Sequence, residues 1–303
     1  MIFQKNFKMK KNKFTLKIIM FSFTALFTLL SCNKSSDFDS NLKEILLRKE
    51  LTNFDFKKIG SMHNDGLNFV LKDLRTKKNK KSLSKGDIDY VELIFDDTEN
   101  YLRSNTDFTY ISENIYTELS DSKYLLLQNQ ENVDYQIINN LKNEISVLLI
   151  SSFGHENFIN INNLLERFET EEAYTLSDLQ IDLNQIDYNI MNQLTIPLED
   201  LVLLRSLIAT LNASLSYWSQ NLYEWQDLNN NNNFKQKSRD WGWFRATIKK
   251  MGVADAYGAG VGAVVGFVSS LASGPGVVIG TLAGAVGYGM NASALQGVRE
   301  LLQ

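Results

Sequence analysis

The C-terminal part of the chain constrains the fold most strongly, because it is rich in glycine and carries no charge. Twelve of the seventeen glycines lie between residues 252 and 297, and no charged residue occurs from Ala256 to Val298. The glycines recur at every fourth position on either side of a Ser-Gly-Pro-Gly turn: Gly258, Gly262 and Gly266, then Gly276, Gly280 and Gly284. A spacing of four places small residues on one helix face, where two backbones can approach closely. The pattern predicts a hairpin of two helices packed through their glycine faces.

The two glycine-rich helices need an environment that keeps water away from their backbones. A glycine inside a helix costs ~1 kcal/mol relative to alanine, so the helices would be weak if water surrounded them. Three interpretations stay open: insertion into a membrane, burial as a glycine zipper within a soluble protein or oligomer, or a low-complexity tail. Residues 256–273 would extend roughly 27 Å as a helix, slightly less than the ~30 Å hydrocarbon thickness of a bilayer.

The segment before the hairpin combines aromatic and basic side chains. Trp241 and Trp243 lie among six basic residues, namely Lys235, Lys237, Arg239, Arg245, Lys249 and Lys250. Such a mixture is typical of a membrane interface, which predicts Trp241 and Trp243 as interface anchors. The alternative is that both tryptophans pack on the protein and the basic side chains are solvated.

The N-terminus has the order of a secretory signal peptide. A lysine-rich start precedes an apolar run from Ile18 to Leu30, and the run ends in Leu29-Leu30-Ser31-Cys32. These four residues resemble the bacterial lipobox. The resemblance implies cleavage after residue 31 and lipidation, palmitate included, of Cys32 as the first mature residue. It therefore predicts an outer-membrane lipoprotein of the cell envelope. Such a lipoprotein could face the periplasm or be exposed at the cell surface. An ordinary signal peptide followed by a chance cysteine is the alternative.

Composition limits the remaining possibilities. Removal of the leader takes away six lysines and no acids, so the formal charge falls from −4 to −10. An acidic chain argues against nucleic acid as a partner. Cys32 is the only cysteine, so neither a disulfide nor a cysteine-based zinc site is expected within one chain. Only two prolines occur, which together with abundant helix formers favours a mainly α fold.

Along the chain, we expect five parts. They are a signal peptide over residues 1–31, a tether over 32–40, a multi-helix body over 41–228, an asparagine-rich linker over 229–240 and the hairpin region over 241–303. The clearest body helix is predicted over 195–227, where Pro197 and two acids mark the start of a long apolar stripe. Breaks between helices are expected at 76–86, at 128–132 and at Phe153-Gly154-His155.

Four short segments resemble segments of Bacteroidota proteins. Asp255-Ala256-Tyr257-Gly258-Ala259-Gly260 and Gly280-Thr281-Leu282-Ala283-Gly284-Ala285 are similar to the glycine-zipper tails of bacteriocin-like peptides and of uncharacterised Bacteroidota proteins. The segment 59–67 resembles a Gly-x-x-His-Asn-x-x-Leu pattern of the same group, and Ser36-Asp37-Phe38-Asp39 resembles the acidic signal of surface-exposed lipoproteins. The resemblance implies an envelope protein with a membrane-active or self-associating tail. The resemblance does not assign any enzymatic activity to the chain.

No catalytic residue, metal site or cofactor is predicted. His63 and His155 are the only histidines, and no serine lies in a nucleophile-elbow motif beside them; His63-Asn64 is expected to cap or pack at a helix start. Asp227, Asn229 and Asn231 imitate the start of a calcium loop, but the glycine and the final glutamate that such a loop needs are missing. The adjacent acids Asp96 and Asp97 are expected on the solvated surface.

Two functional hypotheses follow. The first is a non-enzymatic envelope lipoprotein that is bound to the membrane through the Cys32 lipid. Its hairpin inserts into a membrane or self-associates, which could produce a homo-oligomer. Such a protein could act as a bacteriocin-like effector. The second is a surface lipoprotein that binds a protein or a glycan and uses the hairpin as internal packing.

Overall fold

The structure, a computed structural model, describes residues 37–80, 89–108, 136–228, 241–271 and 276–302, with a few helical positions between 113 and 120. Cys32, the whole signal peptide and the whole predicted linker lie outside the described residues. The chain divides into two compact units, residues 1–49 and residues 50–303.

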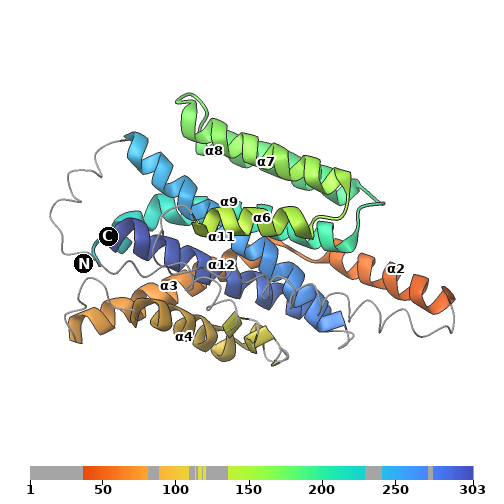
Figure 1. Ribbon diagram of the computed structural model, residues 1–303, viewed down its shortest axis with the longest axis horizontal. Coiled ribbons are helices and arrows are strands. Elements are labelled where there is room, and N and C mark those ends of the chain that lie inside the picture. The colour runs from red at the N-terminus through yellow and green to blue at the C-terminus, as the bar shows by residue number, and fades with distance from the viewer. Residues whose placement is uncertain are drawn as a thin grey trace, which may run out of the picture. The chain divides into compact units, whose positions relative to one another are not determined.

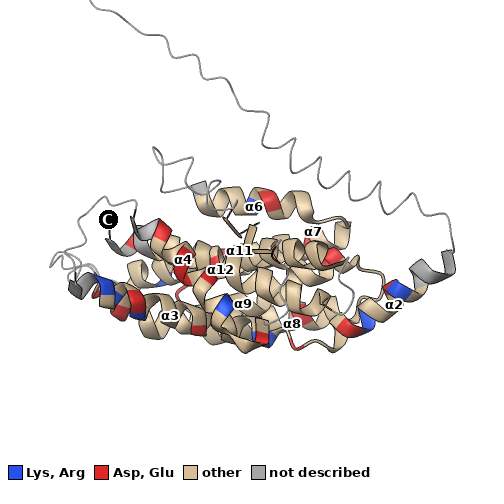
Figure 2. Cartoon of the chain, turned by 90° about the horizontal axis from the view of Figure 1, so that it is seen from below, with Lys and Arg blue, Asp and Glu red and all other residues tan. Residues whose placement is uncertain are grey.

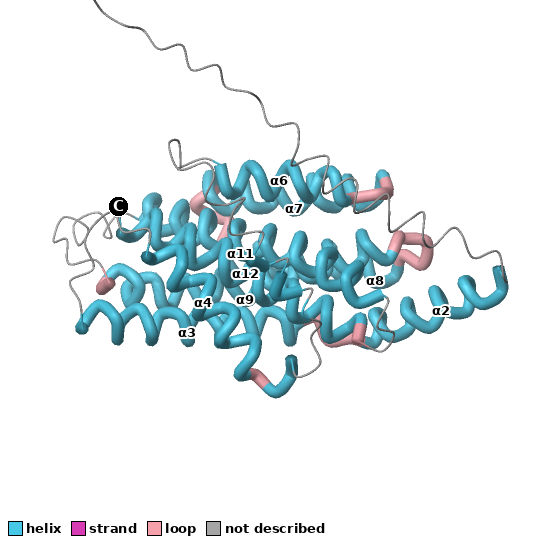
Figure 3. Tube along the Cα trace, turned by 60° about the horizontal axis from the view of Figure 1, so that its bottom comes forward, coloured by secondary structure: helices cyan, strands magenta, loops and turns pink. Residues whose placement is uncertain are grey.

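The described residues are helical, which confirms the predicted mainly α class, and none of them lies in a strand (Figure 3). The helices are α2 (Asp37–Asn53), α3 (Lys57–Lys80), α4 (Asp89–Ser104), the 3-10 turn η1 (Thr106–Phe108), α6 (Gln136–Leu148), α7 (Ser152–Thr170), α8 (Leu176–Asn192), α9 (Leu198–Gln226), α11 (Trp241–Ser270) and α12 (Val277–Leu302).

Helices α11 and α12 pack against each other along their lengths and run antiparallel. The pairing is read from the glycines, because Gly258 lies against Tyr288, Gly262 against Gly284 and Gly266 against Gly280. A Cβ atom at Gly262, Gly266 or Gly284 would come closer than 3.0 Å to a backbone carbonyl of the facing helix. The two backbones therefore touch without intervening side chains, as the spacing of four predicts.

The other helices of the second unit cover this pair. Helix α9 packs along α11, α3 and α4 pack on α12, and α6 and α7 pack on α11, while α8 lies on α7 and α9 (Figure 1). Every residue from Met251 to Val264 of α11 is buried. Charged residues concentrate on the surrounding helices, and α11 and α12 are largely free of them in Figure 2. The glycine-rich pair is thus the core of the second unit.

Helix α9 begins where its sequence signals indicate. Pro197 is its N-cap residue, and Glu199 and Asp200 lie in its first turn. Asp200 is fully buried and also holds the start of α7, because its carboxylate accepts hydrogen bonds from the backbone N–H of Ile150 (2.8 Å) and of Ser151 (3.0 Å). A single acid therefore serves two helix starts, where negative charge is favourable.

Several helix bounds differ from the prediction. Helix α2 already begins at Asp37, inside the expected tether. Helix α3 continues to Lys80, so the break predicted from residue 76 is wrong over 76–80; its lysines keep helical propensity although they end the apolar pattern. The break predicted at Phe153-Gly154-His155 is also wrong, because Ser151 caps α7 by accepting a hydrogen bond from the Gly154 N–H.

Glycine substitutions within α11 test the backbone contact. We expect Gly262→Ala to lower the free energy of unfolding by about 2 kcal/mol, because its methyl group must push apart two backbones. We expect Gly260→Ala to leave stability unchanged or to raise it by up to ~1 kcal/mol, since its Cβ would meet the Leu203 carbonyl and Leu207 only at 3.5 Å. Urea unfolding of the two variants gives the comparison, and equal effects would contradict the backbone contact.

Candidate functional site

Five of the six predicted glycines lie inside the helix pair, and each of these five packs against the backbone of the facing helix. Gly258 packs on the Tyr288 carbonyl, and Gly280 packs on Ser270 and on the Gly266 carbonyl. Gly276 differs, because it lies in the turn just before α12, where its carbonyl accepts a hydrogen bond from the Gly280 N–H (2.8 Å). Gly276 therefore belongs to the start of α12 and not to the packed face.

The predicted interface residues lie at the start of α11. Trp241 is 62% exposed and stacks on Phe244 at 5.4 Å, and Phe244 in turn stacks on Tyr223 of α9 at 6.0 Å. Trp243 is half-buried. The aromatic side chains are thus attached to α9, although Trp241 keeps more than half of its surface open to solvent.

The basic residues next to these tryptophans already have partners inside the protein. Lys249 pairs with Glu169 of α7, and Lys250 lies 3.0 Å from the carboxylate of Glu300 in α12. Arg245 is 6% exposed. Lys235, Lys237 and Arg239 lie outside the described residues. The three described cations are therefore engaged within the bundle, which reduces what this segment can offer to lipid headgroups.

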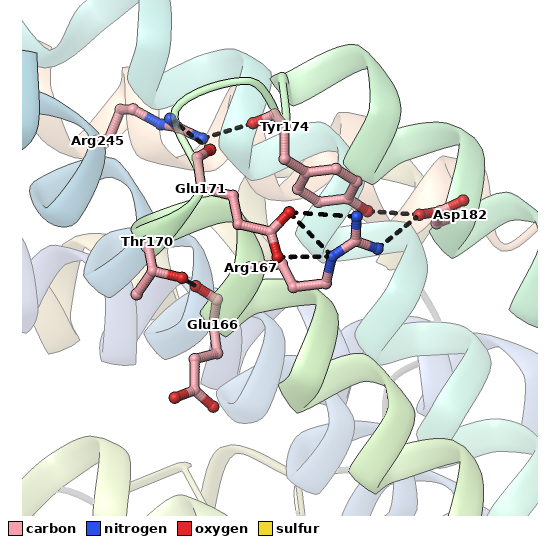
Figure 4. Close-up of polar contacts among 7 residues, drawn as sticks. All are labelled: Glu166, Arg167, Thr170, Glu171, Tyr174, Asp182 and Arg245. Carbon is pink, nitrogen blue, oxygen red and sulfur yellow. Dashed lines mark hydrogen bonds and ion pairs between the residues drawn. The ribbon is translucent and has the colours of Figure 1, made fainter.

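Arg245 fixes the α7–α8 turn to α11, as Figure 4 shows. Its guanidinium donates to the backbone carbonyls of Glu171 (3.1 Å), Glu172 (3.4 Å) and Tyr174 (2.5 Å). It also lies over the Phe168 ring at 4.6 Å. A cation at the C-terminus of α7 complements the carbonyl ends that the helix leaves unpaired.

The same turn carries a second polar cluster on its outer side. Arg167 pairs with Glu171 at 3.3 Å and approaches Asp182 of α8 at 3.9 Å, while the Tyr174 hydroxyl donates to Asp182 at 2.6 Å (Figure 4). These exposed ion pairs contribute little individually. Together with Arg245 they hold α7 and α8 in one orientation relative to α11.

A fully buried polar cluster lies at the centre of the second unit. Asp255 of α11 accepts hydrogen bonds from Trp218 Nε1 (2.9 Å) and from the Ser214 hydroxyl, both on α9. His63 Nε2 of α3 lies 3.7 Å from the same carboxylate oxygen. Burial raises the pKa of Asp255, while the neighbouring His63 and the hydroxyl and indole donors oppose that rise. Three helices therefore meet at one carboxylate.

This cluster contains the residue types of a catalytic triad but not its geometry. The Ser214 hydroxyl donates to the acid instead of to the histidine, whereas a triad needs the histidine between serine and acid. Ser214, His63 and Asp255 are all fully buried, so a substrate has no access to them. The arrangement is suited to fixing helix positions and not to bond cleavage.

The segment 59–67 is a packing motif of α3. Gly60 packs on the Ala209 carbonyl of α9, the Asn64 side-chain amide donates to the Ala213 carbonyl (3.1 Å), and Gly66 packs on Met290 of α12. The expectation that His63 and Asn64 stand at a helix start is wrong, because α3 begins at Lys57 and both residues are inside it. They face neighbouring helices because glycines on the same helix allow a close approach.

Asp97 also departs from the prediction, because it is buried and not on the solvated surface. It is 3% exposed, whereas its neighbour Asp96 is exposed. Lys77 of α3 pairs with Asp73 and lies 3.5 Å from Asp97 of α4. Burial raises the pKa of Asp97 from 3.8 to about 7, the Asp73 charge adds to that rise, and Lys77 opposes it.

The calcium-loop residues and His155 are the remaining candidates. Asp227 follows α9 as its C-cap residue, while Asn229 and Asn231 lie outside the described residues. His155 lies in the first turn of α7. In the part of the chain that the structure describes, no group of three or more His, Cys, Asp or Glu side chains is placed to hold a metal ion.

The sequence did not predict the roles of Asp255 and Arg245 as buried polar groups that join helices. Asp255 had a usable signal, since it is the last charged residue before a long uncharged run and stands among apolar neighbours. Arg245 had none, because its partners are backbone carbonyls some seventy positions earlier in the chain.

Comparison with known proteins adds no family. No family model, curated protein or solved structure matches the chain. Function must therefore be argued from the geometry.

Asp97 makes a specific contribution to the pH dependence of stability. Because its folded-state pKa is raised, its favourable contribution is complete below about pH 4 and is lost as the pH rises through about 7. We expect Asp97→Asn to flatten the stability profile between about pH 4 and 7 by up to about 1.4 kcal/mol per pH unit. Urea unfolding at several pH values measures the profile. Asp96→Asn is the matched control and should keep the wild-type slope; an unchanged slope in Asp97→Asn would refute the assignment.

Proposed function

We propose that the chain is a non-enzymatic lipoprotein of the cell envelope, anchored through Cys32, and that its helical bundle is a water-facing binding module for a protein or glycan. In this proposal the glycine-rich hairpin is the core of the module and not a membrane span. The supporting observation is the all-round burial of α11 from Met251 to Val264 by its neighbours.

The polar contacts of the hairpin support this assignment. Asp255 is held by side chains of α9, and Arg245 binds the α7–α8 turn. Tyr257 donates a hydrogen bond to Asn162 of α7. Each of these groups would lose a partner if the hairpin left the bundle, and an unpaired polar group is costly in hydrocarbon. The hairpin is therefore adapted to this protein environment.

Fractionation of a leaderless chain that starts at residue 33 tests the proposal. Without the leader and without Cys32, we expect a folded, helical protein that stays soluble and does not float with vesicles after a carbonate wash, which removes peripherally bound protein. In the full chain, we expect an alkyne-palmitate label that is lost in Cys32→Ala. A leaderless chain that floats after carbonate washing would reject the core assignment, and an unlabelled full chain would reject the lipoprotein assignment.

Membrane insertion of the hairpin is the second candidate, because the described helices include three that are long and apolar enough to cross a membrane. These are α9, α11 and α12 as far as Gly297. Within the bundle, 89% of the apolar stretch of α11 is buried. Insertion would therefore require α11 to separate from α9 first.

A disulfide between α9 and α11 tests this second candidate. The Cβ position at Gly260 lies 3.5 Å from the Leu207 Cβ, which suits a disulfide. In a Leu207→Cys/Gly260→Cys chain without Cys32, membrane insertion predicts dye release from vesicles only when the disulfide is reduced. Our leading proposal expects no release in either state. The Gly260→Cys single variant controls for the thiol.

A further inference from the structure

Helix α2 carries an apolar face that water contacts. Leu42 is 45% exposed, Ile45 is 64% exposed and Leu46 is 54% exposed. With about 100° of rotation per residue, these three side chains fall within an arc of about 100° on one side of the helix. Leu51, further along the same helix, is fully buried and belongs to the other side of the helix and to the second unit.

Charged residues lie both opposite the apolar face and at its C-terminal end. Glu44 lies opposite the apolar face, where Arg48 approaches it at 3.6 Å. Lys49 is exposed and follows Ile45 and Leu46 by one helical turn, so it lies on the apolar side. A lysine in that place can extend along the apolar surface and hold its ammonium at the level of lipid headgroups.

The apolar face of α2 lies close in sequence to the proposed lipid anchor. Only residues 33–36 separate Cys32 from Asp37, where α2 begins. An extended chain spans at most ~3.6 Å per residue, so the helix starts within roughly 18 Å of Cys32. If Cys32 is lipidated, a bilayer surface is therefore always within reach of the apolar face.

We propose that α2 binds the bilayer interface, with Leu42, Ile45 and Leu46 at the acyl boundary and with the surface of the anchoring membrane as the partner. This inference rests on the proposed lipid at Cys32. The helix adds apolar contact next to the lipid and fixes the direction in which the chain leaves the membrane.

A single thiol label on α2 tests the proposal in the full lipidated chain. Lipidation consumes the Cys32 thiol, so a cysteine introduced at Leu46 or at Glu44 is the only free thiol. These two positions are two residues apart, which places them about 200° apart around the helix. Both side chains are exposed, and the only described contact that is lost is the surface ion pair of Glu44 with Arg48, which contributes little to stability. An environment-sensitive fluorophore is attached, and the protein is placed in phosphatidylethanolamine–phosphatidylglycerol vesicles.

We expect a nitroxide-labelled lipid to quench the Leu46→Cys label at least threefold more than the Glu44→Cys label. Iodide in the water should show the reverse order. Equal iodide quenching at both positions would overturn the proposal, and so would a Leu46→Cys label shielded from both quenchers, which would indicate a protein partner. Failure of the lipoprotein assignment gives a different result, because the wild-type chain would then take up the thiol label at Cys32 and would not stay with the vesicles.

Discussion

The contact between the backbones of α11 and α12 is the interaction on which the second unit depends. Because Gly262 and Gly284 present no side chains to each other, the helices approach until carbonyl oxygens face α-carbons. This closeness moves the valines and other large side chains of both helices to their outer faces. Those faces must then be buried, and α9, α3, α4 and α6 supply the cover. The glycine spacing thus explains why this helix pair can be central, and why its outer faces need other helices to cover them.

A core of small residues leaves the position of helices along one another weakly defined, because side-chain interdigitation is limited. Buried polar groups restore that definition. Asp255 can accept hydrogen bonds from α9 only when Ser214 and Trp218 lie beside it. Arg245 can donate to the carbonyls of the α7–α8 turn only at its present position along α11. A shift by one helical turn would leave these groups buried and unpaired, which costs more than the hydrogen bonds contribute when formed.

The sequence predicted the features that depend on local periodicity. The spacing of Gly258, Gly262 and Gly266 indicated the helix pair, and Pro197 with its two following acids indicated the start of α9. Burial of Asp97 could not be predicted, because its surroundings come from Lys77 and Asp73 of another helix. The expectation for the basic segment after Trp241 depended on composition alone, and composition is the same whether the cations face headgroups or the carboxylates of Glu169 and Glu300.

Length and apolarity do not distinguish a membrane span from the innermost helix of a bundle, because both helices are surrounded by apolar groups on every side. Polar residues distinguish them. In a bilayer, Asp255 would have to find new hydrogen-bond donors or become protonated, and Tyr257 would lose Asn162. The helices α3 and α4, whose apolar faces now cover α12, would also have to find new cover. The hairpin could leave the bundle only if a membrane offered equivalents for all of these contacts together, so the bundle and the hairpin are best understood as one cooperative core.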